Sequence, residues 1–270
     1  MQCINPVWIN DYDLWVPCGK CMPCKIARSR EWATRMLHEL NYAGGCFVTL
    51  TYDDAHLPYD NGLQKREITL WMKKLRKEIE PKKIKYYLCG EYGEKYGRPH
   101  YHAIIFGMNP NEETKNIIHD TWNNGFIDVG TVTYDSCRYV AEYIQKGLMS
   151  GTNLKQLGSR CRPFALMSKG IGKKYALENK KQLIQQLSVS VHGVKTGIPR
   201  YYRKILPEIT QEMIAEKALE AKAKKETSLT KQCNGDVEKI WPRVLSVRRQ
   251  TLNKIIGKRN VRKSRDPGAH

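Results

Sequence analysis

Apolar residues recur in two different rhythms over the first 205 residues of the chain. Alternation at every second position is typical of strands, and it occurs in residues 46–52, 84–90, 100–107 and 126–134. Spacings of three and four positions are typical of amphipathic helices, and they occur in residues 25–40, 67–80, 112–123 and 136–148. Because strands and helices are mixed without a regular strand–helix alternation, we predict an α+β fold with a largely antiparallel central sheet flanked by helices.

The same patterns divide the chain into three segments. Residues 1–45 hold a cysteine-rich stretch and the first amphipathic helix, and residues 46–204 hold the mixed core. Residues 205–270 are rich in Glu and Lys with little apolar area, and their stretch 254–265 contains no acid. We predict a basic tail, helical to disordered, that holds DNA without regard to its sequence.

Composition narrows the class of protein. Of the 270 residues 41% are hydrophobic, enough for a sizeable core, so a disordered or low-complexity chain is excluded. The 46 Lys and Arg exceed the 27 Asp and Glu by a formal net charge of +19, which favours a polyanionic partner such as nucleic acid. Because we find no apolar run of membrane-spanning length, no secretion signal and no GxxxxGK[ST] phosphate loop, we expect a cytoplasmic protein without a membrane partner or bound ATP.

Four of the nine cysteines lie close together near the start of the chain, at Cys3, Cys18, Cys21 and Cys24. Two-residue spacings in a chain without a secretion signal favour metal binding over disulfides. Four thiolates are the ligand set of a closed structural zinc site, so we predict Zn²⁺ here, which requires Cys3 to fold back toward the other three. An iron–sulfur cluster and free thiols are the alternatives.

One predicted strand offers a second candidate metal site. His100 and His102 lie two positions apart and therefore project from the same face, whereas Tyr101 projects from the other. Two imidazoles and a carboxylate would suit Mg²⁺ or Mn²⁺ acting on phosphate. Glu91, at the end of the preceding strand, is the first candidate for that carboxylate, and Glu94 is the second. The alternative is a strand with two partly buried histidines.

The predicted helix 136–148 carries a candidate nucleophile. Tyr139 and Tyr143 are four positions apart and lie on one side of the helix, with Lys146 three positions farther on. A phenol is a poor nucleophile at neutral pH unless a metal or an ammonium group stabilises its anion, and Lys146 is placed to do so. Two tyrosines at this spacing also suit ordinary packing in a core.

Taken together, these residues resemble the HUH endonucleases, in which two histidines flank a bulky residue and one or two catalytic tyrosines lie on a helix downstream. More narrowly, the chain is similar to the replication initiator proteins of microviruses, the small single-stranded DNA bacteriophages, and especially to their gokushovirus branch. The motifs that carry this likeness cover about residues 1–175, and they are Cys18–Cys24 with Ser29–Ala33, Phe47–Asp54, Gly90–Gly93 with Arg98–His102, Tyr139–Lys146, and Pro163–Ser168 with Gly170–Gly172.

This resemblance implies an enzyme, a metal-dependent DNA nickase and strand transferase built on an HUH-type sheet. His100, His102 and Glu91 would bind the metal. Tyr139 or Tyr143 would attack single-stranded DNA at the phage origin, leaving a 5′-phosphotyrosine and a 3′-OH that primes rolling-circle replication. The second tyrosine would let the strands be rejoined without ATP. A host helicase and polymerase would be the partners, in the cytoplasm of the bacterial host.

Basic residues at four places are candidate DNA contacts. They lie on the outer face of the first helix, before the histidine pair, and after a glycine-rich turn whose amides would touch a phosphate. These residues are Arg28, Arg30 and Arg35, then Arg98, then Lys173 and Lys174. An exposed helix face explains the first three equally well.

Two other functions stay open. The charge and the cysteines alone would suit a non-catalytic, zinc-containing nucleic-acid-binding protein. The same chemistry also serves HUH transposases and relaxases, although the phage-like motifs disfavour them. Formation of a covalent protein–DNA product separates an initiator from a passive binder.

Overall fold

The computed structural model describes most of the chain up to residue 210. The described residues are 3–10, 14–93, 96–146, 157–191, 193–208, 210, 212–214, 216, 217, 220 and 227. The chain divides into two compact units, of which one is Ser29–Ile205 and the other combines Met1–Arg28 with Leu206–His270. Nearly all of the predicted basic tail, 205–270, therefore lies outside the described residues.

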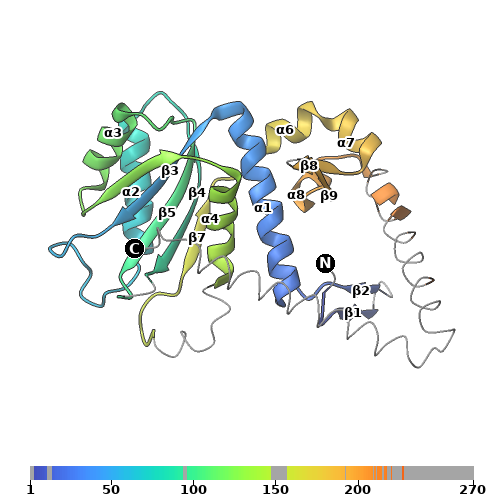
Figure 1. Cartoon of the computed structure of the whole chain (residues 1–270), viewed down its shortest axis with the longest axis horizontal. Coiled ribbons are helices and arrows are strands. Elements are labelled where there is room, and N and C mark those ends of the chain that lie inside the picture. The colour runs from blue at the N-terminus through green and yellow to red at the C-terminus, as the bar shows by residue number, and fades with distance from the viewer. Residues whose placement is uncertain are drawn as a thin grey trace. The chain divides into compact units, whose positions relative to one another are not determined.

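A five-stranded sheet forms the centre of the larger unit (Figure 1). Its strands are β3 (Gly45–Thr51), β4 (Lys85–Tyr92), β5 (Pro99–Phe106), β6 (Ile127–Thr131) and β7 (Phe164–Met167). They lie in the order β6-β3-β5-β4-β7, and every neighbouring pair is antiparallel. The predicted α+β fold with a central antiparallel sheet is confirmed.

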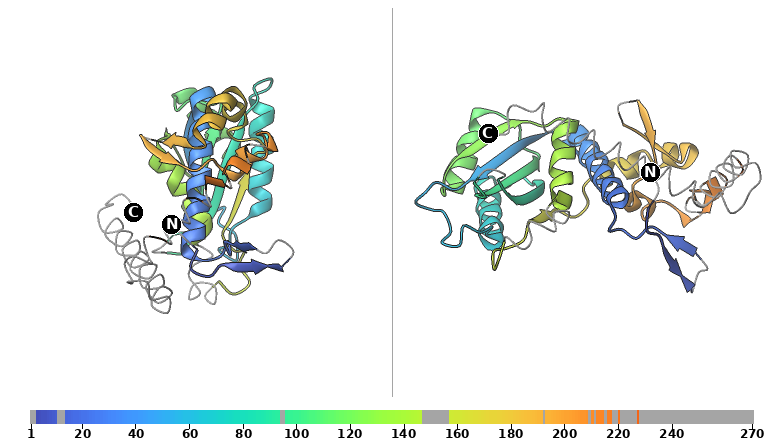
Figure 2. Two further views of the ribbon diagram at one scale, coloured as in Figure 1. Left: turned by 90° about the vertical axis from the view of Figure 1, so that its right-hand side faces the viewer. Right: turned by 60° about the horizontal axis from the view of Figure 1, so that its bottom comes forward.

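Helices cover both faces of this sheet (Figures 1 and 2). The four long ones are α1 (Met22–Ala43), α2 (Lys65–Glu78), α3 (Glu112–Trp122) and α4 (Tyr134–Lys146). Apolar residues of α2 and α3 pack against one face, around Leu50 and Tyr101. Apolar residues of α1 and α4 pack against the other, around Tyr87 and Ile104. The second half of α1 thus belongs to the core of the larger unit, so the predicted boundary at residue 45 falls inside that unit.

The segment after β7 forms small elements that the sequence patterns did not predict. They are α6 (Lys173–Glu178), α7 (Lys180–Gln186), β8 (Val189–Val191), β9 (Val194–Thr196) and α8 (Arg200–Arg203). Each is too short to show a clear apolar period. Buried polar side chains of α1 hold this segment in place.

Arg35 overturns part of the predicted basic face of α1. Its side chain is buried, Nε donates to the Ile171 carbonyl at 3.1 Å, and the guanidinium lies 4.0 and 4.2 Å from the ring centroids of Trp32 and Tyr201. Stacking between two aromatic rings uses the flat faces of the guanidinium. The prediction that Arg35 contacts DNA is therefore wrong, because the side chain faces the core.

His38 lies one turn farther along α1 and is also buried. Its ring stacks on Tyr175, with the centroids 3.5 Å apart, and its Nδ1 lies 2.9 Å from the Tyr202 hydroxyl. The neighbouring Glu39 accepts from the Lys85 ammonium and from the Gly172 amide, both at 2.7 Å. These contacts fix the α6–α8 segment on α1.

The stability of the protein should fall with acid because of His38. Burial lowers the pKa of His38 to about 4. Between the ordinary histidine value of about 6.5 and this value, the unfolded chain takes up a proton that the folded chain refuses, so the free energy of unfolding should drop by roughly 3 kcal/mol. Urea denaturation from pH 7.5 to 4.5 measures the drop, and His38→Gln should lose that part of it. Parallel pH profiles for the two proteins would contradict the assignment.

The smaller unit contains a short hairpin near the start of the chain. Strands β1 (Val7–Ile9) and β2 (Leu14–Val16) pair antiparallel, with Val7 opposite Val16. The hairpin returns the chain on itself and so carries Cys3 back to Cys18. Within the described residues, no helix combines the length and the apolar character that crossing a bilayer requires.

Candidate active site and metal centre

The two histidines project from the sheet face that α1 and α4 cover. In the register of the sheet, His100 lies between Thr51 and Glu91, and His102 lies between Thr49 and Cys89. Residues directly opposite one another on neighbouring strands point to the same face. The register therefore places Glu91 on the face of both histidines, at one end of the sheet.

His102 is held at both ring nitrogens. Nε2 lies 2.9 Å from the Glu91 carboxylate, and Nδ1 lies 3.1 Å from the Thr49 hydroxyl. The side chains of His102 and Glu91 are only 12% and 13% exposed. A ring held on both sides keeps one orientation, which is the usual arrangement of a histidine that binds a metal through one nitrogen.

Tyr101, between the histidines, anchors the strand from the opposite face. Its hydroxyl accepts from the Gln64 amide at 2.7 Å and lies 3.1 Å from the Tyr52 hydroxyl. The Tyr52 hydroxyl in turn donates to Glu67 at 2.6 Å. The position of the two imidazoles is thus set from both faces of the sheet.

His100 packs against the turn that follows β4. A Cβ atom at Gly93 would lie 2.7 Å from His100 Nε2, so a side chain there would displace the imidazole. Burial, together with the charges of His102 and Arg98, lowers the pKa of His100. The ring is neutral at pH 7 and offers a lone pair, as a metal ligand must.

The donor types of His100, His102 and Glu91 fit the predicted divalent ion, since they combine two imidazoles with a carboxylate. Their positions fit only in part. Glu91 and His102 touch, but among the described residues these three do not bring their donor atoms within 4.8 Å of one another, whereas the four cysteines do. Binding an ion would require the side chains to close around it. The second candidate, Glu94, lies outside the described residues.

Tyr139 lies beside His102. Their ring centroids are 5.4 Å apart at 85°, and the ring of Phe47 contacts both. The Tyr139 side chain is 38% exposed, so solvent or a substrate reaches it. Tyr143 and Lys146 follow on the same helix, but their side chains lie outside what the structure describes. The structure thus brings one of the two predicted tyrosines to the histidine pair.

The four cysteines of the smaller unit converge. Cys3 Sγ lies 3.4 Å from Cys18 Sγ and 3.6 Å from Cys21 Sγ, and all four sulfur atoms lie within 4.8 Å of one another. Sulfurs at about 2.3 Å from a tetrahedral zinc ion would be about 3.8 Å apart. The cysteine geometry therefore fits a single closed metal site.

The thiols of this cluster differ in acidity. Amide N–H groups of Cys21 and Lys20 lower the pKa of Cys18 to about 6, whereas burial raises the pKa of Cys24 to about 12. Burial also raises the pKa of Cys3. Cys18 is thus the thiolate at neutral pH from which assembly of a metal site would begin.

Comparison with known proteins identifies relatives of this chain. A family model for replication-associated proteins of the ORF2 type matches residues 45–148, from β3 to beyond the end of α4. The chain is 34% identical over 234 residues to the replication-associated protein VP4 of Bdellovibrio phage phiMH2K, which covers 76% of this chain and 73% of that one. It belongs to the family of phage replication-associated proteins. This membership confirms the microvirus-like resemblance seen in the motifs.

Two further relatives of the family align over less of their own length. The replication-associated protein ORF2 of Spiroplasma virus 4 is 36% identical over 216 residues, which is 69% of this chain and 66% of that one. The replication-associated protein ORF4 of Chlamydia phage 1 is 29% identical over 226 residues, covering 76% of this chain and 56% of that one. No solved structure matches the chain.

The remaining basic residues of this family member lie at separate places. Arg28 and Arg30 are exposed, whereas Arg98 binds the Asp54 carboxylate at 2.7 Å and the Tyr52 carbonyl at 3.1 Å. Arg98 therefore fixes the loop after β3. Lys173 and Lys174 are exposed at the start of α6.

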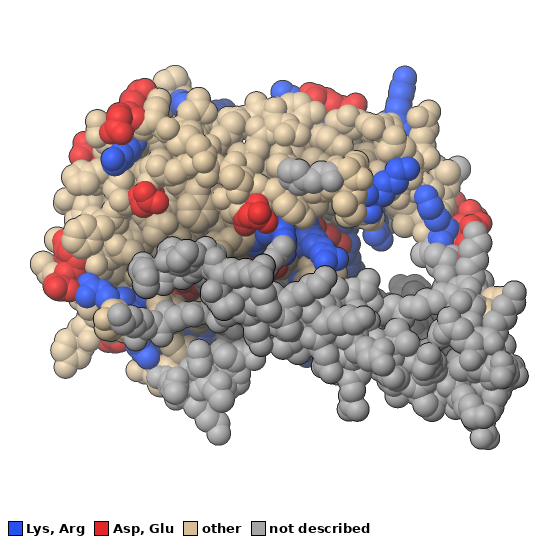
Figure 3. All heavy atoms as spheres, viewed as in Figure 1, with Lys and Arg blue, Asp and Glu red and all other residues tan. Residues whose placement is uncertain are grey.

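These two lysines line a hollow of about 680 Å³, together with Lys85, Lys169, Gly170, Leu177, Glu178 and Tyr201. Figure 3 shows Lys and Arg atoms gathered near α6 and α7 on the same face of the molecule. The hollow combines ammonium groups with an aromatic ring, the side chains that hold a nucleic-acid backbone.

Sequence reasoning missed Phe47 as a site residue. It lies two positions before Thr49 on the same strand, so the alternation already placed it on the face of His102. Its contact with Tyr139 arises only when α4 packs on the sheet, and no local pattern signals that contact.

Proposed function

We propose that the chain is a replication initiator of the HUH class that cleaves single-stranded DNA at the phage origin through a tyrosine nucleophile. The observation that supports this most is Tyr139, a partly exposed phenol whose ring lies 5.4 Å from that of His102. A nucleophile beside a pair of imidazoles and a carboxylate is the arrangement that phosphoryl transfer with a divalent ion needs.

In the proposed reaction, the Tyr139 oxygen attacks the scissile phosphorus. A bond from that oxygen to phosphorus forms, the bond to the 3′ oxygen breaks, the phenolic proton passes to solvent, and the 3′ oxygen takes up a proton. When bound by His100, His102 and Glu91, Mg²⁺ or Mn²⁺ would polarise the phosphate and offset its charge. Thr49 holds His102 in place during the step, and Lys146 would stabilise the phenolate.

The phosphotyrosine link conserves the energy of the broken phosphodiester bond. A 3′-OH can therefore attack it and rejoin the strand without ATP, and Tyr143 would provide the second attack after one round of synthesis. Extension and unwinding would be carried out by a polymerase and a helicase of the host.

We also propose that Cys3, Cys18, Cys21 and Cys24 hold a structural Zn²⁺. The support is the mutual approach of their sulfur atoms within 4.8 Å and the hairpin that carries Cys3 back to the other three. A closed four-thiolate site would stabilise the fold around it and take no part in cleavage.

A second candidate function is a non-catalytic nucleic-acid-binding protein, which the cysteine cluster and the basic hollow would suffice to support. The experiment that separates the two is incubation with circular single-stranded phage DNA and Mn²⁺, followed by a denaturing gel. An initiator gives a protease-sensitive protein–DNA band that a chelator prevents. Binding without any such band would favour the second candidate.

The basic hollow near α6 should contribute a sequence-independent part of DNA binding. Each lysine that neutralises a phosphate of single-stranded DNA adds about 0.7 to the slope of log K against log salt. Lys173→Gln with Lys174→Gln should therefore weaken binding and lower the slope by about 1.4, while the cleavage position stays the same.

Fluorescence anisotropy with a labelled single strand at several salt concentrations measures this slope. The matched control is Lys73→Gln with Lys77→Gln, which removes two exposed lysines from α2 on the other face of the sheet. Equal slopes for the two double variants would show that the hollow does not contact DNA.

A further inference from the structure

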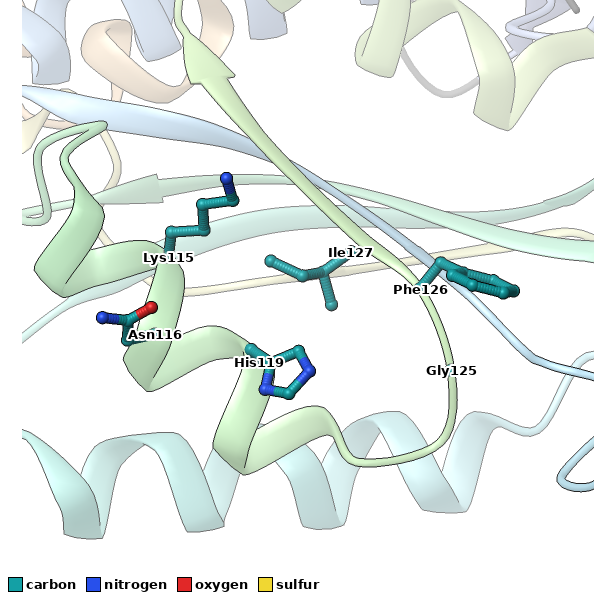
Figure 4. A pocket seen from close by; sticks show the side chains of 6 residues that line it. All are labelled: Lys115, Asn116, His119, Gly125, Phe126 and Ile127. Atoms are coloured by element: carbon teal, nitrogen blue, oxygen red, sulfur yellow. The ribbon is translucent and has the colours of Figure 1, made fainter.

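A second hollow, of about 390 Å³, opens between α3 and the edge strand β6 (Figure 4). It is lined by Lys115, Asn116, His119, Gly125, Phe126 and Ile127. We propose that this hollow binds one base of the single-stranded DNA that lies next to the scissile phosphate. The proposal deepens the proposed initiator function and rests on it for the identity of the ligand.

Phe126 is the aromatic platform of this site. Its side chain is 70% exposed, and Figure 4 shows its ring at the rim of the hollow, across from Lys115 and Asn116. A phenylalanine in this setting leaves most of its apolar surface in water, which costs free energy unless something covers it. The flat face of a base covers such a ring well, and every base has one.

The backbone of Phe126 is rigid, which distinguishes this ring from an ordinary exposed apolar side chain. Its carbonyl accepts from the Thr51 amide at 3.0 Å and from the Thr51 hydroxyl at 3.4 Å. Gly125 has a φ of +146°, and a Cβ there would overlap the Asp53 amide and the Thr51 carbonyl, so only glycine fits. The platform is therefore already in place before a ligand arrives, and binding costs little ordering.

The contacts of Phe126 tie it to the catalytic strand. Thr51 is the register partner of His100 in the β3–β5 pair and the hydrogen-bond partner of Phe126. Phe126 thus lies two strand spacings from His100, roughly 10 Å along the sheet. A nucleotide stacked on Phe126 would be a near neighbour of a phosphate held at the histidines.

The polar lining suits one nucleotide. The amide of Asn116 and the ring of His119 offer donors and acceptors to a base edge, and Lys115 offers an ammonium group to a phosphate. Glu112 lies 3.9 Å from Lys115, and Asp120 lies 3.1 Å from His119. Because these two carboxylates would repel a run of phosphates, the hollow favours a single flipped-out base over a backbone track.

The test uses oligonucleotides that contain the cleavage site and carry 2-aminopurine at successive positions. In the wild type, fluorescence should be quenched at one position next to the cleaved bond, because the base stacks on Phe126. Phe126→Ala should abolish that quenching and weaken binding by about 5- to 150-fold, the range for loss of one stacked base. Phe126→Tyr keeps the ring and should restore both. Leu70→Ala removes another exposed apolar side chain, from α2, and is the matched control.

The outcomes separate this site from the initiator function. Unchanged quenching and affinity in Phe126→Ala, or equal losses in Leu70→Ala, would overturn the base site. If the covalent product forms nonetheless, the initiator function stands alone. Quenching that depends on Phe126 in a protein that never forms a covalent product would support the base site and refute the nuclease.

Discussion

Replacement of both Tyr139 and Tyr143 by phenylalanine is expected to abolish the covalent protein–DNA product while leaving DNA binding almost intact. Removal of a nucleophile from an enzyme that depends on it commonly costs at least about 10³-fold in rate. The ring of Tyr139 keeps its contacts with His102 and Phe47 when only the hydroxyl is lost. The loss should therefore appear in chemistry and not in folding. A denaturing gel of labelled DNA measures the product, and anisotropy measures binding.

Single variants and one control make this result specific. Tyr139→Phe alone should remove most of the first cleavage if the phenol beside His102 attacks first, and Tyr143→Phe alone should then impair the rejoining step. Tyr134→Phe alters a tyrosine at the start of the same helix and should keep full product formation. A covalent product that persists in the double variant would refute the assignment of these nucleophiles.

Loss of the metal from the cysteine cluster is expected to unfold the hairpin that it closes. Zinc binding to four-ligand peptides is worth about 10–16 kcal/mol at neutral pH, more than the whole stability of a typical domain. The purified protein should contain one zinc per chain, and Cys21→Ser should lose it. Hydrogen exchange in Val7–Ile9 and Leu14–Val16 should then become fast.

The control for the cysteine cluster is Cys161→Ser. Cys161 is an exposed thiol outside the cluster, and this variant should keep its zinc. Metal analysis also discriminates between the alternatives, since stoichiometric iron would indicate an iron–sulfur cluster. A Cys21→Ser protein with an unchanged zinc content and unchanged exchange would contradict the structural role.

The sheet and its four long helices were predictable because their signals are local. Strand 46–52 and helix 67–80 show clean apolar periods, and the structure has β3 and α2 within two residues of those bounds. The α6–α8 segment escaped because its elements hold only a few residues each and are fixed by polar contacts with α1. Arg35 was misplaced for the same reason, since a buried arginine between two aromatic rings leaves no mark in a helical period.

The candidate site divides in the same way. The common face of His100 and His102 follows from their two-residue spacing, and the position of Glu91 follows from the hairpin that joins β4 to β5. The contact of Tyr139 with His102 depends on how α4 docks, and the hollow beside Phe126 depends on how α3 approaches the edge of the sheet. Contacts between elements distant in sequence are set by tertiary packing, so only a family resemblance suggested the first, and nothing local suggested the second.

The chain of hydroxyl contacts through Tyr101 makes the two faces of the sheet one mechanical unit. Tyr101 links the catalytic strand to Tyr52 and, through it, to Glu67 on α2. A loosened helix on the side that never meets DNA would let the imidazoles drift by the few tenths of an ångström that phosphoryl transfer does not tolerate. The precision of the chemistry therefore depends on a layer remote from the substrate, so this layer can change only in ways that keep that alignment.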